Sequence, residues 1–369
     1  MTNHTLLYEK DNNMGKLAVQ KYFSFMMLII TFLLMIFTFT GLYGGEVPPA
    51  GNTARAMLVY ALPFLIAGNI IFLIYWLVLR RFHWMLMPLI TLLCCIPYIG
   101  TLYQFGNLDE TADAQPGLKI ASYNVAMFGR ETSGFMAQDI LSEMKKQKVD
   151  IVCFQEYNDH AGDKKNSDSY KDYFPYMAVG QGDMVIYSRY PIKKTKNINF
   201  EMTNNSAMWA EIEANEVTYR VYNAHLETTG INGTLHRAAK MSNNGIEVEG
   251  NSLVRAIYGN YTIGMIARSG QANMLAMDMR EAQVPIIVCG DFNDVPYSYV
   301  YNTMLGDKVD GFTECGSGFM YTFRGGSKKV RIDYIFHDKG MQALSYYKRE
   351  LTYSDHNPVF SKISLTPQQ

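Results

Sequence analysis

The feature that most constrains this chain is a set of three long stretches without a charged side chain. They are Tyr22–Tyr43, Ala56–Leu79 and Phe82–Phe105. A helix needs about 20 mostly apolar residues to cross the hydrocarbon core of a bilayer, and each stretch reaches that length. The first is too long for the apolar region of a signal peptide, and helices that are apolar on every face are rare inside a soluble domain. The sequence therefore predicts a membrane region at residues 1–105, with three transmembrane helices at about these positions.

Basic residues near the ends of the three stretches predict the direction in which they cross the membrane. Lys10, Lys16 and Lys21 precede the first stretch, and Arg80 and Arg81 separate the second from the third. Basic flanks stay on the cytoplasmic side. We therefore expect a multi-pass protein of the cell (inner) membrane with a cytoplasmic N-terminus. Three crossings then place the C-terminal part outside the cytoplasm.

The charge balance of the C-terminal part limits what it can bind without sequence preference. The chain has 33 Lys and Arg against 34 Asp and Glu, and residues 1–115 contain six of each kind, which leaves 27 basic and 28 acidic side chains in the remaining 254 residues. Strong non-specific binding to nucleic acid depends on an excess of positive charge. A near-neutral domain does not favour that function.

The C-terminal part has the pattern of an α/β domain. Residues 106–117 are polar with Gly and Pro and predict a linker, and residues 118–369 are the predicted domain. Apolar residues recur at helical spacing in 137–148 and 261–283. Eight apolar segments have strand character, namely 118–125, 149–157, 183–192, 208–214, 217–227, 284–293, 329–338 and 357–365. Such an alternation indicates packed sheets covered by helices.

Residues 228–260 break this pattern. They are rich in Gly, Asn and Ser and follow directly after a predicted strand. A long connection of this kind in a compact domain is often a lid or a binding loop. An unstructured surface loop is the alternative that the sequence leaves open.

Polar side chains stand where several of the apolar strands end, and an apolar strand has no packing reason to end that way. Each alone has a structural explanation, such as a turn or a cap. Together they supply oxygen ligands for Mg²⁺, two histidines and amide donors, without a Ser or Cys nucleophile beside a matching base. This combination predicts metal-assisted hydrolysis of a phosphoester. The residues are Asn124, Gln155, Glu156, Asn223, His225, Asp291, Asn293, Asp333, Ser354, Asp355 and His356.

The order and spacing of these residues resemble the endonuclease/exonuclease/phosphatase superfamily. Its branches include pancreatic-type deoxyribonucleases, apurinic endonucleases, neutral sphingomyelinases and inositol polyphosphate 5-phosphatases. The motifs that carry the resemblance lie within about residues 117–365, and they are SYNV, FQE, YSRYPI, NAHLE, GDFND, RIDYIF and SDHNPV. The resemblance implies an α/β fold, a four-layered αββα sandwich of two central β-sheets flanked by helices, with the site at one end of the sheets. In this chain the three transmembrane helices precede it.

The resemblance also implies a role for each acidic residue near the metal. Glu156 would be the main metal ligand, with Asn124 beside it, and Asp355 would complete the metal or water network. The expected cofactor is Mg²⁺, with Mn²⁺ and Ca²⁺ as alternatives. Asp291 would orient or deprotonate the attacking water.

The remaining site residues would bind the phosphate. In the resemblance, Asn293 holds the scissile phosphate, and His225 contacts it together with Asn223. His356 bonds a phosphate oxygen or acts as an acid or base, and these two roles stay open. Asp333 would align a histidine, His356 in this interpretation, and stabilise its charge.

Two departures from the family pattern narrow the choice of branch. Apurinic endonucleases carry an acid two residues after the strand-end Asn, where this chain has Ala126, and they use a Tyr-containing segment in place of NAHLE. DNA repair is therefore disfavoured. Three spans followed by a domain of this type also occur in membrane proteins linked to glycopeptide resistance, whose implied substrates are polyprenyl (pyro)phosphates. That likeness is one of architecture and does not by itself fix the function.

The sequence thus favours a membrane-anchored, Mg²⁺-dependent phosphoester hydrolase with an extracytoplasmic site. The expected partners are the lipid bilayer and a phosphate ester, a lipid-linked phosphate or a phospholipid head group, and no obligate protein partner is evident. Arg237 and Arg268, with Lys240 and Arg255, are candidates to meet anionic head groups. The alternatives are an extracellular or periplasmic metal-dependent endonuclease and, in another class, a catalytically silent binding domain.

Overall fold

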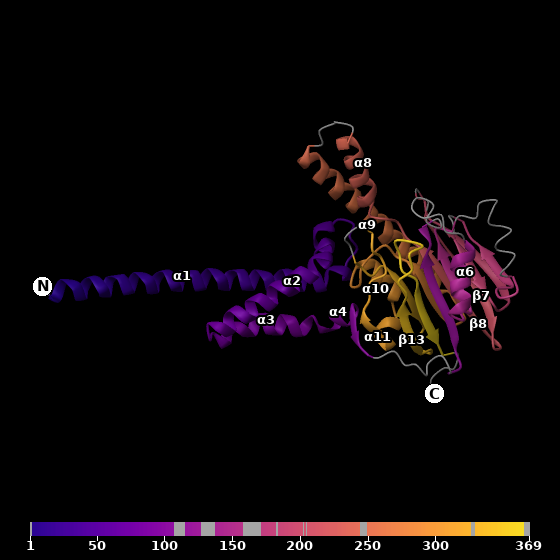
Figure 1. Cartoon of the computed structure of the whole chain (residues 1–369), viewed down its shortest axis with the longest axis horizontal. Coiled ribbons are helices and arrows are strands. Elements are labelled where there is room, and N and C mark those ends of the chain that lie inside the picture. The colour runs from indigo at the N-terminus through magenta and orange to yellow at the C-terminus, as the bar shows by residue number, and fades with distance from the viewer. Residues whose placement is uncertain are drawn as a thin grey trace. The chain divides into compact units, whose positions relative to one another are not determined.

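A computed structural model gives the architecture of the chain (Figure 1). It describes residues 2–106, 115–126, 137–157, 171–181, 184–201, 203, 205–243, 249–325 and 329–364. The chain forms two compact units. The first contains Met1–Gly44 and Ala54–Tyr98, and the second contains Gly45–Thr53 and Ile99–Gln369. Most of the predicted linker, 107–114, lies outside the described residues.

The first unit is helical, as the three uncharged stretches predict. Three of its helical segments are long and apolar enough to cross a membrane: Val19–Glu46, Thr53–Val78 and Phe82–Gly100. Polar side chains face the inside of this unit, where the Trp76 indole donates to Thr31 Oγ1 at 3.0 Å. Such interhelical bonds replace water in an apolar surrounding. The elements are α1 (Thr2–Leu42), η1 (Gly44–Glu46), α2 (Thr53–Val78), α3 (Phe82–Cys94) and α4 (Ile96–Gly100).

The third apolar helical segment ends five residues before the predicted Phe105. Residues Tyr103–Phe105 form strand β1, which pairs antiparallel with β11, Ser317–Phe319, in the second unit. An apolar run that contains Tyr and Phe fits a strand as well as a helix. The composition alone therefore could not place this boundary.

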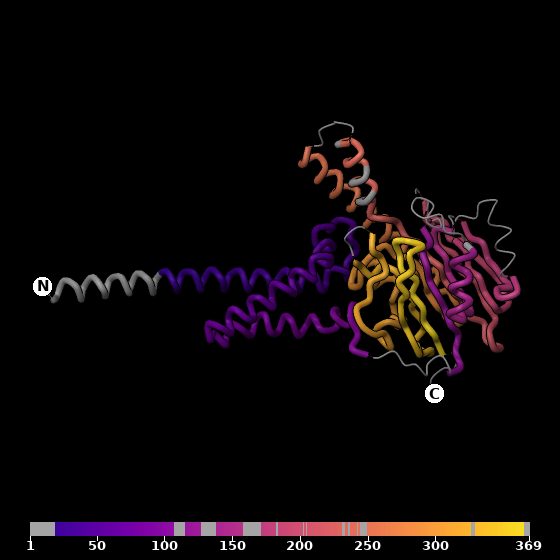
Figure 2. Tube along the Cα trace, in the orientation of Figure 1, coloured from indigo at the N-terminus to yellow at the C-terminus, as the bar shows by residue number. Residues whose placement is uncertain are grey.

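The second unit contains two six-stranded sheets within the residues that the structure describes. Each is mixed, with one parallel pair at its centre, β2 with β3 in one sheet and β8 with β9 in the other. In spatial order, the first sheet contains β13 (Ala343–Lys348), β14 (Val359–Ile363), β2 (Leu118–Asn124), β3 (Ile151–Gln155), β5 (Val185–Ser188) and β4 (Tyr176–Val179). The second contains β10 (Val309–Asp310), β12 (Asp333–His337), β9 (Ile286–Asp291), β8 (Val217–His225), β7 (Ser206–Ala214) and β6 (Ile192–Asn199). Strands far apart in sequence thus lie side by side, as β14 does beside β2 (Figure 2).

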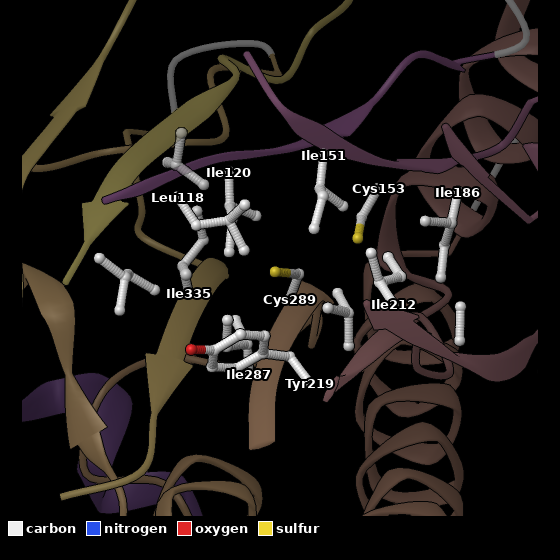
Figure 3. Close-up of a cluster of buried hydrophobic side chains, with 14 of the residues drawn as sticks. Leu118, Ile120, Ile151, Cys153, Ile186, Ile212, Tyr219, Ile287, Cys289 and Ile335 are labelled. Atoms are coloured by element: carbon white, nitrogen blue, oxygen red, sulfur yellow. The ribbon is translucent and has the colours of Figure 1, made fainter. Parts of the chain in front are cut away.

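The two sheets stack face to face, and helices cover their outer faces. Side chains of both sheets, among them Ile120, Cys153 and Cys289, meet in one buried cluster (Figure 3). Helix α6, Ala137–Lys146, packs on the outside of the first sheet. Helices α9, Gly250–Arg280, and α10, Tyr299–Leu305, pack on the outside of the second, and α11 (Gly311–Cys315) follows β10. The predicted four-layered αββα sandwich is confirmed.

Residues 228–260 differ from the prediction. Within the described residues they are mostly helical, because α8 occupies Ile231–Asn243 and α9 begins at Gly250, eleven residues before the predicted start. The two helices contact each other, and Asn260 Nδ2 donates to Thr234 Oγ1 at 2.8 Å. Packing of one helix on the other overrides the weak helical preference of a segment rich in Gly and Asn. Residues 244–248 lie outside the described part.

Candidate active site

The candidate site lies where the central strands of both sheets end. Parallel strands β2 and β3 end together, with Asn124 paired to Gln155. Parallel strands β8 and β9 also end together, with His225 paired to Asp291. Strands β12 and β14 run antiparallel to these neighbours, so their first residues lie at the same edge. The topology therefore collects polar residues from six separate parts of the sequence at one end of the sandwich.

The backbone at this edge adopts conformations that ordinary strands do not use. Glu156 has φ 53° directly after β3, and Asn293 has φ 51° two residues after the end of β9. Left-handed conformations are uncommon for residues other than Gly and turn each side chain away from the line of its strand. Gly290 has φ 145°, and a Cβ added there would lie 2.0 Å from the carbonyl oxygen of Ala224. Only Gly therefore fits beside β8 immediately before Asp291.

Two carboxylates converge on one amide at the centre of the site. Asn124 Nδ2 donates to Glu156 Oε1 and to Asp291 Oδ2, each at 3.0 Å. The Asn124 Oδ1 accepts from the backbone N of Ala126 at 3.0 Å, which fixes this orientation of the amide. His225 Nε2 lies 3.7 Å from Glu156 Oε1 and 3.9 Å from Asp291 Oδ2. The first sheet thus supplies Asn124 and Glu156, and the second supplies the other two residues.

Asp333 and His356 form a buried pair beside Asp291. His356 Nδ1 donates to the Asp333 carboxylate, at 3.0 Å from Oδ2 and 3.2 Å from Oδ1. Its Nε2 lies 3.6 Å from Asp291 Oδ2. Burial lowers the pKa of His356, but the charges of Asp333 and Asp291 outweigh it and raise the pKa to about 10. The ring therefore carries a positive charge at neutral pH.

Asp291 is the most buried acid of the central group, with 1% of its surface exposed. Burial, followed by the charge of Asp333, raises its pKa to about 6, although His356, His225 and the Asn124 amide act in the opposite direction. A carboxylate with a raised pKa is a better proton acceptor than an ordinary aspartate. It is therefore suited to accept a proton near neutral pH.

The donor set fits a divalent cation that prefers oxygen. Glu156 and Asp291 present carboxylate oxygens to the same place, and Mg²⁺ commonly binds through one or two carboxylates together with water and substrate phosphate. Glu156 is partly exposed, so an ion and water have access to it. Oxygen and nitrogen atoms of Asp291, Asp333 and His356 also lie within 4.8 Å of one another. In that group, however, the charged ring of His356 and its bond to Asp333 disfavour a cation.

Helix α9 holds the two loops that carry site residues. Arg268 is fully buried, and its Nη1 donates to the carbonyl oxygen of Glu227 at 2.9 Å while its Nε lies 3.4 Å from Asp294 Oδ2. Gln271 Oε1 accepts from the backbone N of Glu227 at 2.8 Å. These bonds fix the chain just after His225 and just after Asn293. Arg268 was predicted to meet the substrate, but its burial places it behind the site.

Two other residues that were predicted to belong to the site, Asn223 and Asp355, have surroundings that differ from those expected for their predicted roles. Asn223 is fully buried, and its amide bonds Gln155 Nε2 at 2.7 Å and the carbonyl oxygens of Phe154 and Val185 at 2.9 and 3.2 Å. It ties the two sheets together below the site, so no atom of its amide is left for a phosphate. Asp355 is exposed, and its backbone oxygen accepts from Arg324 at 2.9 Å. Its carboxylate has no hydrogen bond to Asn124, Glu156 or Asp291 among the described residues, but its charge helps to raise the pKa of His356.

Asn293 and Arg237 lie at the edge of the site region. Asn293 is half-buried; its backbone N donates to Asp291 Oδ1 at 2.8 Å and its Nδ2 to the carbonyl oxygen of Leu226 at 2.9 Å. It therefore connects the ends of β8 and β9. Arg237 is exposed on α8 and lines a groove beside the loop after β8. Lys240 and Arg255 are also exposed on the two helices.

Sequence reasoning missed the residues that support the Asp333–His356 pair. Thr322 Oγ1 accepts from the backbone N atoms of Ile332 and Asp333, both at 3.0 Å. The ring of Phe323 lies 5.0 Å from that of His356. These residues sit in a loop without hydrophobic periodicity, so the pattern of the sequence contains no signal for them.

Fold and site together define a metal-dependent hydrolase of phosphoester bonds. Residues 121–356 match the model of the Endonuclease/Exonuclease/phosphatase family, and the chain belongs to this family. Residues 23–102 match a domain of unknown function, DUF8431. No curated protein matches the chain.

Several solved structures are similar to the catalytic unit. An endonuclease/exonuclease/phosphatase from Bacteroides vulgatus has 17% identity and a TM-score of 0.49, over 68% of this chain and 100% of that chain. A mannosyl-6-phosphatase from Bacteroides thetaiotaomicron has 16% identity and a TM-score of 0.46, over 67% of this chain and 100% of that chain. The beta toxin of Staphylococcus aureus has 17% identity and a TM-score of 0.44, over 66% of this chain and 99% of that chain.

Proposed function

We propose that the protein hydrolyses a phosphate ester of a membrane lipid, with Mg²⁺, at the outer face of the cytoplasmic membrane. The observation that carries the proposal is the convergence of Asn124, Glu156, His225, Asp291 and His356 at one end of the two sheets. The three apolar helices support a lipid as the substrate, because a catalytic unit attached to a bilayer meets lipid substrates at high effective concentration.

In this proposal Glu156 binds the cation, with Asp291 close by, and the Asn124 amide orients both carboxylates through its two N–H donors. A bound Mg²⁺ would supply positive charge to a phosphate oxygen in the transition state. Glu156 is the accessible carboxylate of the set and lies 3.0 Å from the Asn124 amide. Excess Mg²⁺ is therefore expected to restore part of the activity that is lost when Glu156 is substituted.

Side chains of the protein accept and donate the protons in the proposed reaction. Asp291 accepts a proton from the attacking water as its oxygen forms a bond with phosphorus, and the ester oxygen leaves with a proton from His356. Asp333 keeps His356 charged and oriented through the bond at 3.0 Å. His225 Nε2 is buried and has no hydrogen-bond partner among the described residues, so it is placed to contact the phosphate.

Two observations support the proposed location. The basic flanks favour a cytoplasmic N-terminus, and three crossings then bring the catalytic unit outside. An odd number of crossings also requires the connection between the first two spans to lie on the catalytic side. Gly45–Thr53, which form that connection, belong to the same unit as the catalytic sheets. A reporter fused after Gln369 should therefore be active outside the cytoplasm, and activity only inside would refute the orientation.

The experiment that tests the reaction uses the full-length protein in detergent micelles. Release of phosphate or of the alcohol is measured from sphingomyelin, phosphatidylinositol, a polyprenyl pyrophosphate and duplex DNA, with Mg²⁺ and with EDTA. We expect Mg²⁺-dependent hydrolysis of a lipid that is lost in Asp291→Ala. Efficient cleavage of DNA with every lipid left intact would replace the proposal by a nuclease. No hydrolysis of any phosphoester would indicate a binding domain.

A further inference from the structure

A groove of 640 Å³ lies beside the candidate active site, on the side of helices α8 and α9. Helix α9 contributes the apolar residues Ile263, Ile266 and Ala267 to its lining, together with Asn260, and α8 contributes Arg237. Figure 1 shows α8 beside the first half of α9. The volume falls within the range of about 300–1,000 Å³ that is usual for small-molecule sites.

The groove begins at the chain segment that leaves the active site. Glu227 and Thr228 form part of its lining, and Glu227 is two residues after His225. Two residues of extended chain span at most about 7 Å. Gly264 lets α9 approach this segment, because a Cβ there would lie 2.4 Å from the carbonyl oxygen of Thr228. A molecule whose phosphate occupies the site therefore has the groove directly beside it.

The surface around the groove is apolar although it is exposed. Ile263 and Ile266, which line the groove, have 68% and 38% of their surface exposed. Scattered exposed apolar residues are ordinary, but apolar residues gathered around a groove indicate an apolar ligand. The groove also contains Glu201 and Glu227, whose carboxylates would repel the backbone of a nucleic acid.

Contacts inside the catalytic unit join this region to the segment that connects the first two spans. Gly45–Thr53 connect the first two spans, so they lie at the membrane surface. Thr53 Oγ1 lies 3.4 Å from the Tyr258 hydroxyl of α9, and Asn302 of α10 donates to Glu46 at 3.4 Å. The first half of α9, with its exposed apolar side chains, therefore lies beside the segment that connects the first two spans.

We infer that the groove between α8 and α9 binds the hydrocarbon chain of the lipid substrate, next to the bond that is hydrolysed. The inference rests on the proposed function, because it assigns the part of the substrate that lies beyond the phosphate. The chain runs from the bilayer along Ile263 and Ile266, and the phosphate lies between Glu156, His225 and His356. Each methylene buried in this way strengthens binding about fourfold.

A pair of chromogenic phosphodiesters tests the inference on the full-length protein in detergent micelles with Mg²⁺. Hexadecyl 4-nitrophenyl phosphate and ethyl 4-nitrophenyl phosphate differ only in the length of the alkyl chain. Burial of three further methylenes suffices for a difference of about 50-fold in kcat/KM. We expect at least this preference for the hexadecyl ester, and a loss of tenfold or more of it in Ile263→Asn. Hydrolysis of the ethyl ester should stay unchanged in that variant.

Two matched variants separate the groove from a general attraction to micelles. Val254 and Met277 are exposed apolar residues of α9 outside the groove lining, with 65% and 63% of their surface exposed. Val254→Asn and Met277→Asn should keep the preference for the hexadecyl ester. The inference is overturned if they abolish it as Ile263→Asn does, or if the wild-type protein hydrolyses both esters equally well. Failure to hydrolyse either ester would instead refute the proposed function itself.

Discussion

Replacement of Asp333 by Asn should make the reaction depend on pH in a range where the wild-type protein does not. Asn keeps the size of the side chain but removes the largest of the charges that raise the pKa of His356 to about 10. Burial still lowers that pKa, and the charges of Asp291 and Asp355 oppose it, so we expect the pKa to fall to about its ordinary value of 6.5. A fall from about 10 to about 6.5 corresponds to ~5 kcal/mol of lost stabilisation of the charged ring.

The magnitude of the effect follows from the charged fraction of His356. With a pKa of about 6.5, roughly three quarters of the rings are charged at pH 6 and about 3% at pH 8. If the charged ring protonates the leaving oxygen, kcat of Asp333→Asn should fall about 25-fold between pH 6 and pH 8. The wild-type charge is held until the pH approaches 10 and should show no such fall.

The assay is the release of 4-nitrophenol from ethyl 4-nitrophenyl phosphate between pH 6 and pH 9, with Mg²⁺ and with thermal unfolding as a control for the fold. A His356→Gln variant provides the matched background, because Asp333→Asn should have little further effect once the ring is absent. Parallel pH profiles of wild type and Asp333→Asn would refute the reasoning. A full effect of Asp333→Asn in the His356→Gln background would do the same.

Three further outcomes are expected. Glu156→Gln and Asp291→Asn should each lower kcat by several orders of magnitude with the fold intact, and excess Mg²⁺ should restore part of the activity of the Glu156 variant alone. Asp278 is partly buried, which raises its pKa, but hydrogen bonds from Lys196 and Tyr222 outweigh burial and lower the pKa below its usual value. The charged carboxylate therefore stabilises the fold above about pH 4, and this stabilisation is lost as the pH falls through the lowered pKa. Asp278→Asn should therefore reduce the free energy of unfolding by ~2–3 kcal/mol at pH 7, and the difference, measured by denaturant unfolding, should shrink in acid. Gly290→Ala should prevent folding, because its Cβ would overlap the neighbouring strand, whereas Gly270→Ala, with open space around its Cβ in α9, should raise the thermal midpoint slightly.

The strands and the helical layers could be predicted because their sequences are long and periodic. The segment that ends at Asn124 and the segment that ends at Asp291 are mostly apolar and buried at every position, as expected for central strands covered on both faces. Strand β6 was not predicted, because its sequence IKKTKNIN is polar and mostly exposed at the edge of its sheet. The extra helical length of residues 228–260 depends on contacts between two helices, which local composition does not show.

The polar strand ends of the sequence predicted where the site lies, but they did not predict which of its residues face the substrate and which support the fold. Asn223 and His225 are two positions apart on one strand and face the same way. The Asn223 amide is fully hydrogen-bonded between the two sheets, whereas His225 Nε2 has no partner among the described residues and faces the site. Arg268 looks in the sequence like an exposed charge on a helix. Only the packing of α9 against the loops after β8 and β9 shows that it is buried.

The division of the site between two sheets has a consequence for the biosynthesis of the enzyme. Glu156 follows a strand of the first sheet, but β14, the last strand of the described residues, pairs directly with β2, and His356 lies three residues before β14. Every pairing of this kind joins residues that are far apart in sequence, so it forms late. During translation the nascent chain therefore remains inert until its final strand is in place. A catalytic unit of this kind therefore acquires its phosphoesterase site only when its own assembly is complete.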